Sequence, residues 1–172
     1  MVAYVFVLRY LSQMLQVDKV QLGVLTTVMM AGSVVGPLLA GPLSDRVGRK
    51  PVLLVNYVLT CGCYIGLLLV GMNYEILLPV LGITGMAVYS KGALVQTALV
   101  DVADTTSIDM LFGLYFTTGA VIWGLWAVLL SALVDSYGFM VAFAVMAGSQ
   151  VLAGLCVLPV RLRPIQYVIV AS

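Results

Sequence analysis

The residues best suited to chemistry in this chain gather in one short stretch, Gly41-Pro-Leu-Ser-Asp-Arg-Val-Gly-Arg-Lys-Pro51. Four of the fifteen charged residues of the chain lie within it: Asp45, Arg46, Arg49 and Lys50. Gly48 permits a tight turn or a positive φ angle, and Gly41 would let a neighbouring backbone approach closely. Because long runs with almost no charge flank the stretch, its charged side chains are the first candidates for a functional contact between segments.

The composition places these charges beside a lipid bilayer. The chain has 172 residues, of which 63% are hydrophobic and only 9% are charged. Its mean hydropathy of +1.16 lies far outside the range of soluble domains. The net charge of +1 comes without a long acidic or basic run, which argues against nucleic acid as a partner. Histidine is absent, which removes the commonest metal ligand, and we expect no metal and no cofactor.

Five segments are long and apolar enough to cross the bilayer as helices, which takes about 20 mainly apolar residues. Residues 1–17 differ, because Arg9 interrupts the run, and we interpret them as the outer part of a helix whose beginning is missing. We therefore expect an all-α integral membrane protein, with one transmembrane domain over residues 1–172 and one partial helix before five full ones. The five full segments are residues 22–43, 52–72, 76–100, 110–134 and 139–160.

The distribution of lysine and arginine predicts the orientation in the membrane. Short cytoplasmic loops are enriched in these residues, so we expect residues 44–50 and the C-terminus to face the cytoplasm of a plasma (inner) membrane. The opposite side has Lys19 alone. The expected cytoplasmic side has five basic residues, namely Arg46, Arg49, Lys50, Arg161 and Arg163.

Asp45 needs an electrostatic partner near the bilayer, such as water, a cation or a helix N-terminus with its partial positive charge. The helix that starts near Thr106 or Ser107 is the obvious candidate, since both residues can serve as N-caps. We therefore expect Asp45 to hold the end of a neighbouring helix.

The three loop cations, Arg46, Arg49 and Lys50, would then reach Asp101 and Asp104 at the end of the third full segment. The alternative is that these cations only set the topology and contact lipid phosphates. The sequence leaves both roles open for Arg49 and Lys50.

A faint copy of the charged stretch occurs later in the chain. The spacing Gly41-x-x-x-Asp45-x-x-Gly48 recurs as Ser131-x-x-x-Asp135-x-x-Gly138, and each copy lies between two long helices. The two copies are three helices apart and therefore fall on opposite membrane faces. This arrangement predicts an inverted three-helix repeat, a construction common in secondary transporters.

The charged stretch resembles the signature loop of the major facilitator superfamily of transporters. The resemblance rests on Gly41, Asp45, Arg46, Gly48, Arg49 and Lys50 between two spanning helices. Residues 112–124, followed by Asp135-x-x-Gly138, are similar to the penultimate helix and outer turn of the second half of that family. One departure concerns Asp104-Thr-Thr-Ser-Ile-Asp109, which lacks the basic residue that often precedes the eleventh helix.

The resemblance covers nearly the whole chain and implies a C-terminal half of the twelve-helix fold. Residues 1–17 would be the end of the seventh helix, and the other segments the eighth to the twelfth. Such a half would need an N-terminal six-helix half as a partner to enclose a pathway. In this family, contacts of the signature loop hold the cytoplasmic helix ends together in one access state and break in the other.

Two charges interrupt the apolar segments themselves. Lys91 lies well inside residues 76–100, where a cation costs about 2.5–3.5 kcal/mol on insertion scales. Snorkelling to the surface is one explanation, but helical side chains lean toward their own N-terminus, which for Lys91 and Arg9 points toward the membrane centre. We therefore expect both residues to face a watery cavity or an anionic partner.

Aromatic residues add further candidates for a cavity. Trp123 and Trp126 lie near the middle of a segment, where they either pack in the bundle or present a surface on which a solute stacks. Tyr89 is a comparable candidate. The resemblance puts Arg9 and Lys91 on the seventh and tenth helices, which line the central cavity of the family, and so implies an anionic or polar solute.

Together these features predict a secondary carrier of a small organic solute that works by alternating access. An enzyme is not expected, because the sequence lacks histidine, a nucleophile–base pair and an embedded pair of carboxylates. The alternative is a membrane interaction protein that does not transport, or a relic half of a carrier. Gly32-x-x-x-Gly36 predicts close approach of two helices in either case.

Overall fold

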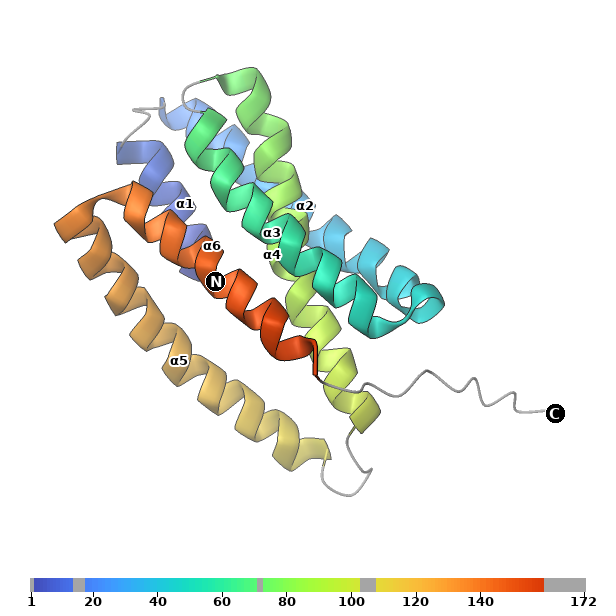
Figure 1. Cartoon of the computed structure of the whole chain (residues 1–172). Helices are drawn as coiled ribbons and strands as arrows, with labels where there is room; N and C mark the ends of the chain where they lie inside the picture. Colours follow the sequence, from blue (N-terminus) through green and yellow to red (C-terminus); the bar gives the residue numbers. More distant parts are fainter. Residues whose placement is uncertain (1, 14–17, 71–72, 103–107, 160–172) are drawn as a thin grey trace.

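The computed structural model of the protein describes residues 2–13, 18–70, 73–102 and 108–159, and these form six α-helices (Figure 1). The described residues contain no strand, which confirms the expected all-α class. The helices are α1 (Val2–Gln13), α2 (Lys19–Val47), α3 (Arg49–Val70), α4 (Tyr74–Val102), α5 (Ile108–Tyr137) and α6 (Phe139–Val157).

Five of these helices, α2 to α6, are long and apolar enough to cross a membrane, as the sequence predicts. Helix α1 has 12 residues and is too short to do so by itself. A helix satisfies its backbone hydrogen bonds internally, which is why apolar runs of this length fold as helices in lipid. The structure therefore confirms five full helices and one short first helix.

Glycines allow α2 and α4 to pack with their backbones in contact. A Cβ atom at Gly32 would lie 2.3 Å from the carbonyl oxygen of Gly82, and one at Gly85 would lie 2.1 Å from that of Met29. Gly36 faces α4 in the same way. Because no larger residue fits at these distances, the close approach predicted from Gly32-x-x-x-Gly36 is confirmed, and α4 is the partner.

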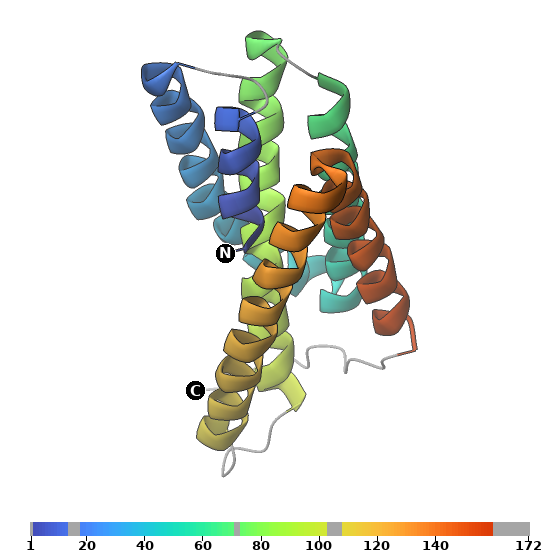
Figure 2. The same cartoon turned by 90° about the vertical axis from the view of Figure 1, so that its left-hand side faces the viewer.

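Helix α5 lies at one edge of the bundle, with α6 between it and α3 (Figure 1). Figure 2 shows α1 between α2 and the last part of α5. The buried residues of α5 are Leu130 and Val134, both near its C-terminal end. The rest of α5 is therefore open on most sides in this part of the protein.

The two connections that contain Gly48 and Gly138 are shorter than the sequence predicts. Residues 44–47 belong to α2 and Arg49 already belongs to α3, so that Gly48 alone separates the helices, with a φ angle of 104°. Gly138 alone separates α5 from α6, with a φ angle of 82°. We call the two ends of the bundle the Gly48 end and the Gly138 end.

One expectation about the charged stretch is wrong. A Cβ atom at Gly41 would meet nothing within 4 Å, so no described backbone approaches this glycine. The close contacts of α2 lie earlier, at Gly36 and Gly32, because α4 crosses α2 there. Gly48, by contrast, adopts the positive φ angle that its sequence position predicts.

Candidate functional site

A cluster of charges joins three helices at the Gly48 end. Arg49, in the first turn of α3, donates from Nε and Nη2 to the carboxylate of Asp101 in the last turn of α4. Its Nη1 lies 3.4 Å from Asp45 Oδ1 and 3.4 Å from Ser44 Oγ, both in the last turn of α2. Arg49 is the centre of this cluster, since only 13% of its side chain is exposed, against 49% for Asp45.

The other loop cations behave differently from Arg49. Lys50 Nζ donates to the carbonyl oxygen of Leu158 at the end of α6, rather than to Asp101. Arg46 is exposed in the last turn of α2, where a cation is favoured by the helix dipole. The remaining expected partners, Asp104, Thr106 and Ser107, lie outside the described residues.

A second ion pair lies at the Gly138 end. Arg9 Nη2 is 2.8 Å from Asp135 Oδ1 in the last turn of α5, and Arg9 Nη1 donates to Ser131 Oγ over 3.3 Å. Arg9 Nε also donates to Gln13 within α1. Of the two environments expected for Arg9, the structure therefore provides the anionic partner. Arg9 does not lie with the other cavity candidates.

The two corners repeat the same backbone geometry. The Gly48 amide donates to the carbonyl of Ser44 over 3.0 Å, and the Gly138 amide donates to that of Val134 over 2.9 Å. In each case an aspartate lies three residues before the glycine and pairs with an arginine. The arginine is local at the first corner and comes from α1 at the second, so the sequence similarity extends to structure and electrostatics.

A cavity of about 470 Å³ brings together the other expected residues. Tyr89 and Lys91 of α4 line it together with Trp123 and Trp126 of α5. Lys91 has the one formal charge among the described residues that line it, and 47% of Trp123 is exposed. The cavity therefore combines aromatic surface with a cation.

Helices α3 and α6 complete this cavity. Lys91 Nζ donates to Gln150 Oε1, and it lies 5.6 Å from the centre of the Tyr57 ring, within the range of a cation–π contact. Tyr64 and Ser149 also line the space, although neither is among the candidates predicted from the sequence. Ser149 and Gln150 are polar residues within an otherwise apolar segment, and this contrast could have identified them; Tyr64 has no such signal.

Comparison with known proteins places the chain among transporters. The sequence profile of the Major Facilitator Superfamily matches residues 1–168. An uncharacterized transporter of Buchnera aphidicola subsp. Schizaphis graminum (strain Sg) is 30% identical over 115 residues, which cover 64% of this chain and 27% of that protein. A D-xylose transporter of Levilactobacillus brevis is 24% identical over 155 residues, which cover 87% of this chain and 33% of that protein. The matched part thus spans between a quarter and a third of these relatives, and no solved structure matches the chain.

Proposed function

The chain belongs to the major facilitator superfamily, and we propose that it is the C-terminal half of a secondary carrier that moves a small organic solute by alternating access. In this assignment α1 is the end of the seventh helix, and α2 to α6 are the eighth to the twelfth. An N-terminal six-helix half is the partner that encloses the pathway. The match over only 27% and 33% of the two relatives supports a partner outside this chain, because each relative is longer than the matched part.

The solute site is the cavity between α4 and α5, and this cavity is the observation that supports transport best. Lys91, Gln150 and Ser149 supply polar contacts, and Trp123 and Trp126 supply faces on which a flat or ring-shaped solute can stack. An unbalanced cation favours an anionic solute, while the aromatic faces and hydrogen-bonding groups also suit a polar one. The D-xylose transporter among the relatives makes pentoses a sensible part of the first screen.

The ion pairs at the two ends are the proposed gates. Arg49 links α2, α3 and α4 through Asp45 and Asp101, and Arg9 links α1 to α5 through Asp135. Each pair has at least one partly exposed member, and ion pairs near the surface contribute only about 0–1 kcal/mol each, so a modest solute-binding energy can offset their loss. The Gly48 end faces the cytoplasm in this proposal.

The experiment uses the protein encoded by the complete reading frame that contains this chain. Both tryptophans of the chain line the cavity, so their fluorescence reports its occupancy. We expect a change on adding solutes from a panel of pentoses, hexoses and organic acids. The same protein with Trp123→Phe and Trp126→Phe serves as the reference. The difference between the fluorescence changes of the two proteins is the signal of these two residues.

Transport in proteoliposomes then tests the role of the cation. Lys91→Gln should raise the apparent Km for an anionic solute about tenfold, the size expected for one charged hydrogen bond. Lys19→Gln is the matched control, because Lys19 is exposed at the start of α2 and does not line the cavity. If no solute in the panel changes the fluorescence or is transported, the carrier proposal fails, and a membrane interaction protein becomes the better interpretation.

A further inference from the structure

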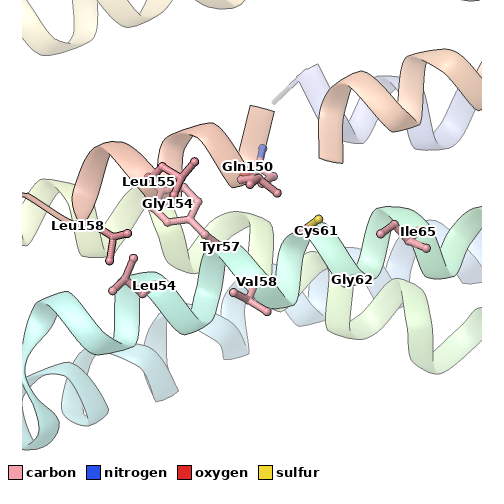
Figure 3. A pocket seen from close by; sticks show the side chains of 11 residues that line it. Leu54, Tyr57, Val58, Cys61, Gly62, Ile65, Gln150, Gly154, Leu155 and Leu158 are labelled. Atoms are coloured by element: carbon pink, nitrogen blue, oxygen red, sulfur yellow. The ribbon is translucent and has the colours of Figure 1, made fainter. Parts of the chain in front are cut away.

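A second hollow lies on the outer face of the bundle, between α3 and α6 (Figure 3). Its volume is about 480 Å³, and it is apolar along almost its whole length. Gly62 and Gly154 have no side chains to fill it, while Val58, Ile65 and Leu155 form exposed walls. We call this hollow the α3–α6 groove. The carrier cycle described above does not use it.

The length of the groove suits a hydrocarbon chain. Its lining runs along α3 from Leu54 to Ile65, which is about 16 Å at 1.5 Å per residue. This is about half of a hydrocarbon core of about 30 Å. The groove begins near the start of α3 at Leu54, and along α6 it runs from Leu158 to Gln150.

The groove is narrow for a protein partner. A volume of about 480 Å³ over this length gives a mean cross-section of about 30 Å², against roughly 80 Å² for a helix about 10 Å across. The base of the groove is closed, since a Cβ atom at Gly154 would lie 3.7 Å from Tyr57 Cβ. A single hydrocarbon chain suits this shape better than a helix of another protein does.

A cation without a carboxylate partner among the described residues lies near the Leu54 end of the groove. Lys50 is on the same face of α3 as Leu54, Val58 and Ile65, one turn before the groove starts. Within the described part of the chain its Nζ contacts the carbonyl of Leu158 and no carboxylate. Lys50 is also in the first turn of α3, where the helix dipole disfavours a cation and favours an anion.

We propose that the α3–α6 groove binds one acyl chain of an anionic phospholipid, whose phosphate pairs with Lys50. The apolar walls bind the hydrocarbon, and the phosphate supplies a negative charge beside Lys50, which has no carboxylate partner among the described residues. Arg49 does not share this role, because Asp45 and Asp101 already compensate its charge.

Native mass spectrometry of the detergent-purified protein tests this proposal directly. With phosphatidylglycerol and phosphatidylcholine of identical acyl chains as probes, the protein should retain one phosphatidylglycerol with about fivefold higher affinity, the effect of about one cation near the surface. Lys50→Gln should remove that preference, whereas Lys19→Gln should not. An equal affinity of the unmodified protein for both lipids would overturn the proposed phosphate contact.

Filling the groove separates headgroup binding from acyl-chain binding. Gly62→Leu places a side chain in the groove where a Cβ atom meets nothing within 4 Å, and it should abolish the retained lipid. Gly23→Leu, at an equally open site on α2, is the control. If Gly62→Leu still retained the lipid, the groove would not be the lipid site. If the unmodified protein formed a dimer that Gly62→Leu dissociates, the groove would be a contact between two copies, and the proposal would also fail.

Cross-linking of the unmodified protein gives an answer that does not depend on how a variant folds. Phosphatidylglycerol with a diazirine in its acyl chain should label α3 and α6 at Val58, Cys61 or Leu155 after illumination. Labels spread evenly over α2 and α5 would contradict a specific site. Lipid binding is measured here without transport, so these outcomes stand apart from success or failure of the carrier proposal.

Discussion

Arg49 is more buried at the Gly48 end than Asp45 is. It contacts carboxylates on two helices, and 13% of its side chain is exposed, against 49% for Asp45. Arg49→Gln leaves two carboxylates facing one another and should lower the free energy of unfolding by about 1 kcal/mol, whereas Asp45→Asn should lower it less. Thermal unfolding of the purified variants measures the difference, and an equal effect of both would contradict the central position of Arg49.

A double-mutant cycle with Asp101 tests the contact of Arg49 directly. In a double-mutant cycle, Arg49→Gln and Asp101→Asn should show a coupling energy of a few tenths of a kcal/mol or more, because they share a direct contact. Asp135→Asn with Arg49→Gln should be additive, since Asp135 lies at the other end of the bundle. If the proposed gates operate, both Arg49→Gln and Asp45→Asn also change the transport rate while membrane insertion is kept.

The pair of Arg9 and Asp135 lends itself to an exchange of charges. Arg9→Asp or Asp135→Arg alone places like charges together and should destabilise the Gly138 end. The double variant restores an ion pair and should recover most of the loss. The expected effect is about 0.2–1 kcal/mol because both side chains are partly exposed, with 32% and 62% of their surfaces accessible. No recovery in the double variant, as measured by thermal unfolding, would argue against the pair.

The limits of sequence reasoning at this scale are visible in Arg9. Its position inside an apolar run indicates that it needs a partner or water, and this follows from residue type alone. Its partner Asp135 is 126 residues away, and which of several acids it meets depends on how α1 packs against α5. Lys91 and Gln150 show the same limit, since they lie 59 residues apart on α4 and α6.

At the scale of elements, the glycine corners hold the helices at their angles. Gly48 and Gly138 have φ, ψ angles of 104°, 149° and 82°, 175°, close to a region that only glycine adopts readily. Gly48→Ala and Gly138→Ala should each cost about 1–3 kcal/mol. Nothing lies within 4 Å of a Cβ atom at Gly138, so its cost comes from the backbone alone. Thermal unfolding that matches the unmodified protein would contradict this prediction.

The contact of α2 with α4 gives a second prediction for elements. Gly85→Ala inserts a methyl group 2.1 Å from the carbonyl oxygen of Met29, and overpacking of this kind costs about 1–3 kcal/mol or more. Gly41→Ala meets nothing and should leave stability within about 0.5 kcal/mol. The fraction of monodisperse protein after heating measures both, and similar values for the two variants would refute the packing argument.

The elements themselves were predictable because lipid permits few alternatives. An apolar run of about 20 residues must satisfy its backbone hydrogen bonds within one helix, so the five spans follow from hydropathy. The corners were not predictable in the same way. Asp45 and Arg46 are the kind of residues found in loops, yet they continue α2, because a single glycine with positive φ is sufficient to reverse the chain.

At the scale of the whole molecule, the open length of α5 is the feature that most needs a partner. From residue 108 to residue 129 none of its described side chains is buried, and Trp123 and Trp126 on this stretch line the cavity. A membrane can cover apolar side chains but not a solute pathway, so the proposed N-terminal half would close this side. The repeated corner geometry supports a bundle built from two inverted three-helix units.

The orientation of this bundle can be tested with one cysteine at each end. In a variant lacking the three native cysteines, Ser136→Cys reports the Gly138 end and Arg46→Cys reports the Gly48 end, since both residues are exposed. The positive-inside rule predicts that a membrane-impermeant maleimide labels Ser136→Cys in intact cells. Arg46→Cys should react only after permeabilisation. Its reaction at that stage shows that the maleimide can label this site as well.

The reverse pattern would exchange the two sides and would place Arg49 at the outer gate and Arg9 at the inner one. It would also move the Leu54 end of the α3–α6 groove, with Lys50, to the outer leaflet, where anionic phospholipids are scarcer than on the cytoplasmic side. The labelling result therefore decides which gate faces the cytoplasm. With the expected orientation, Lys50 lies in the leaflet that supplies its proposed ligand, so the same five basic residues that set the topology also bring this lysine to the lipid.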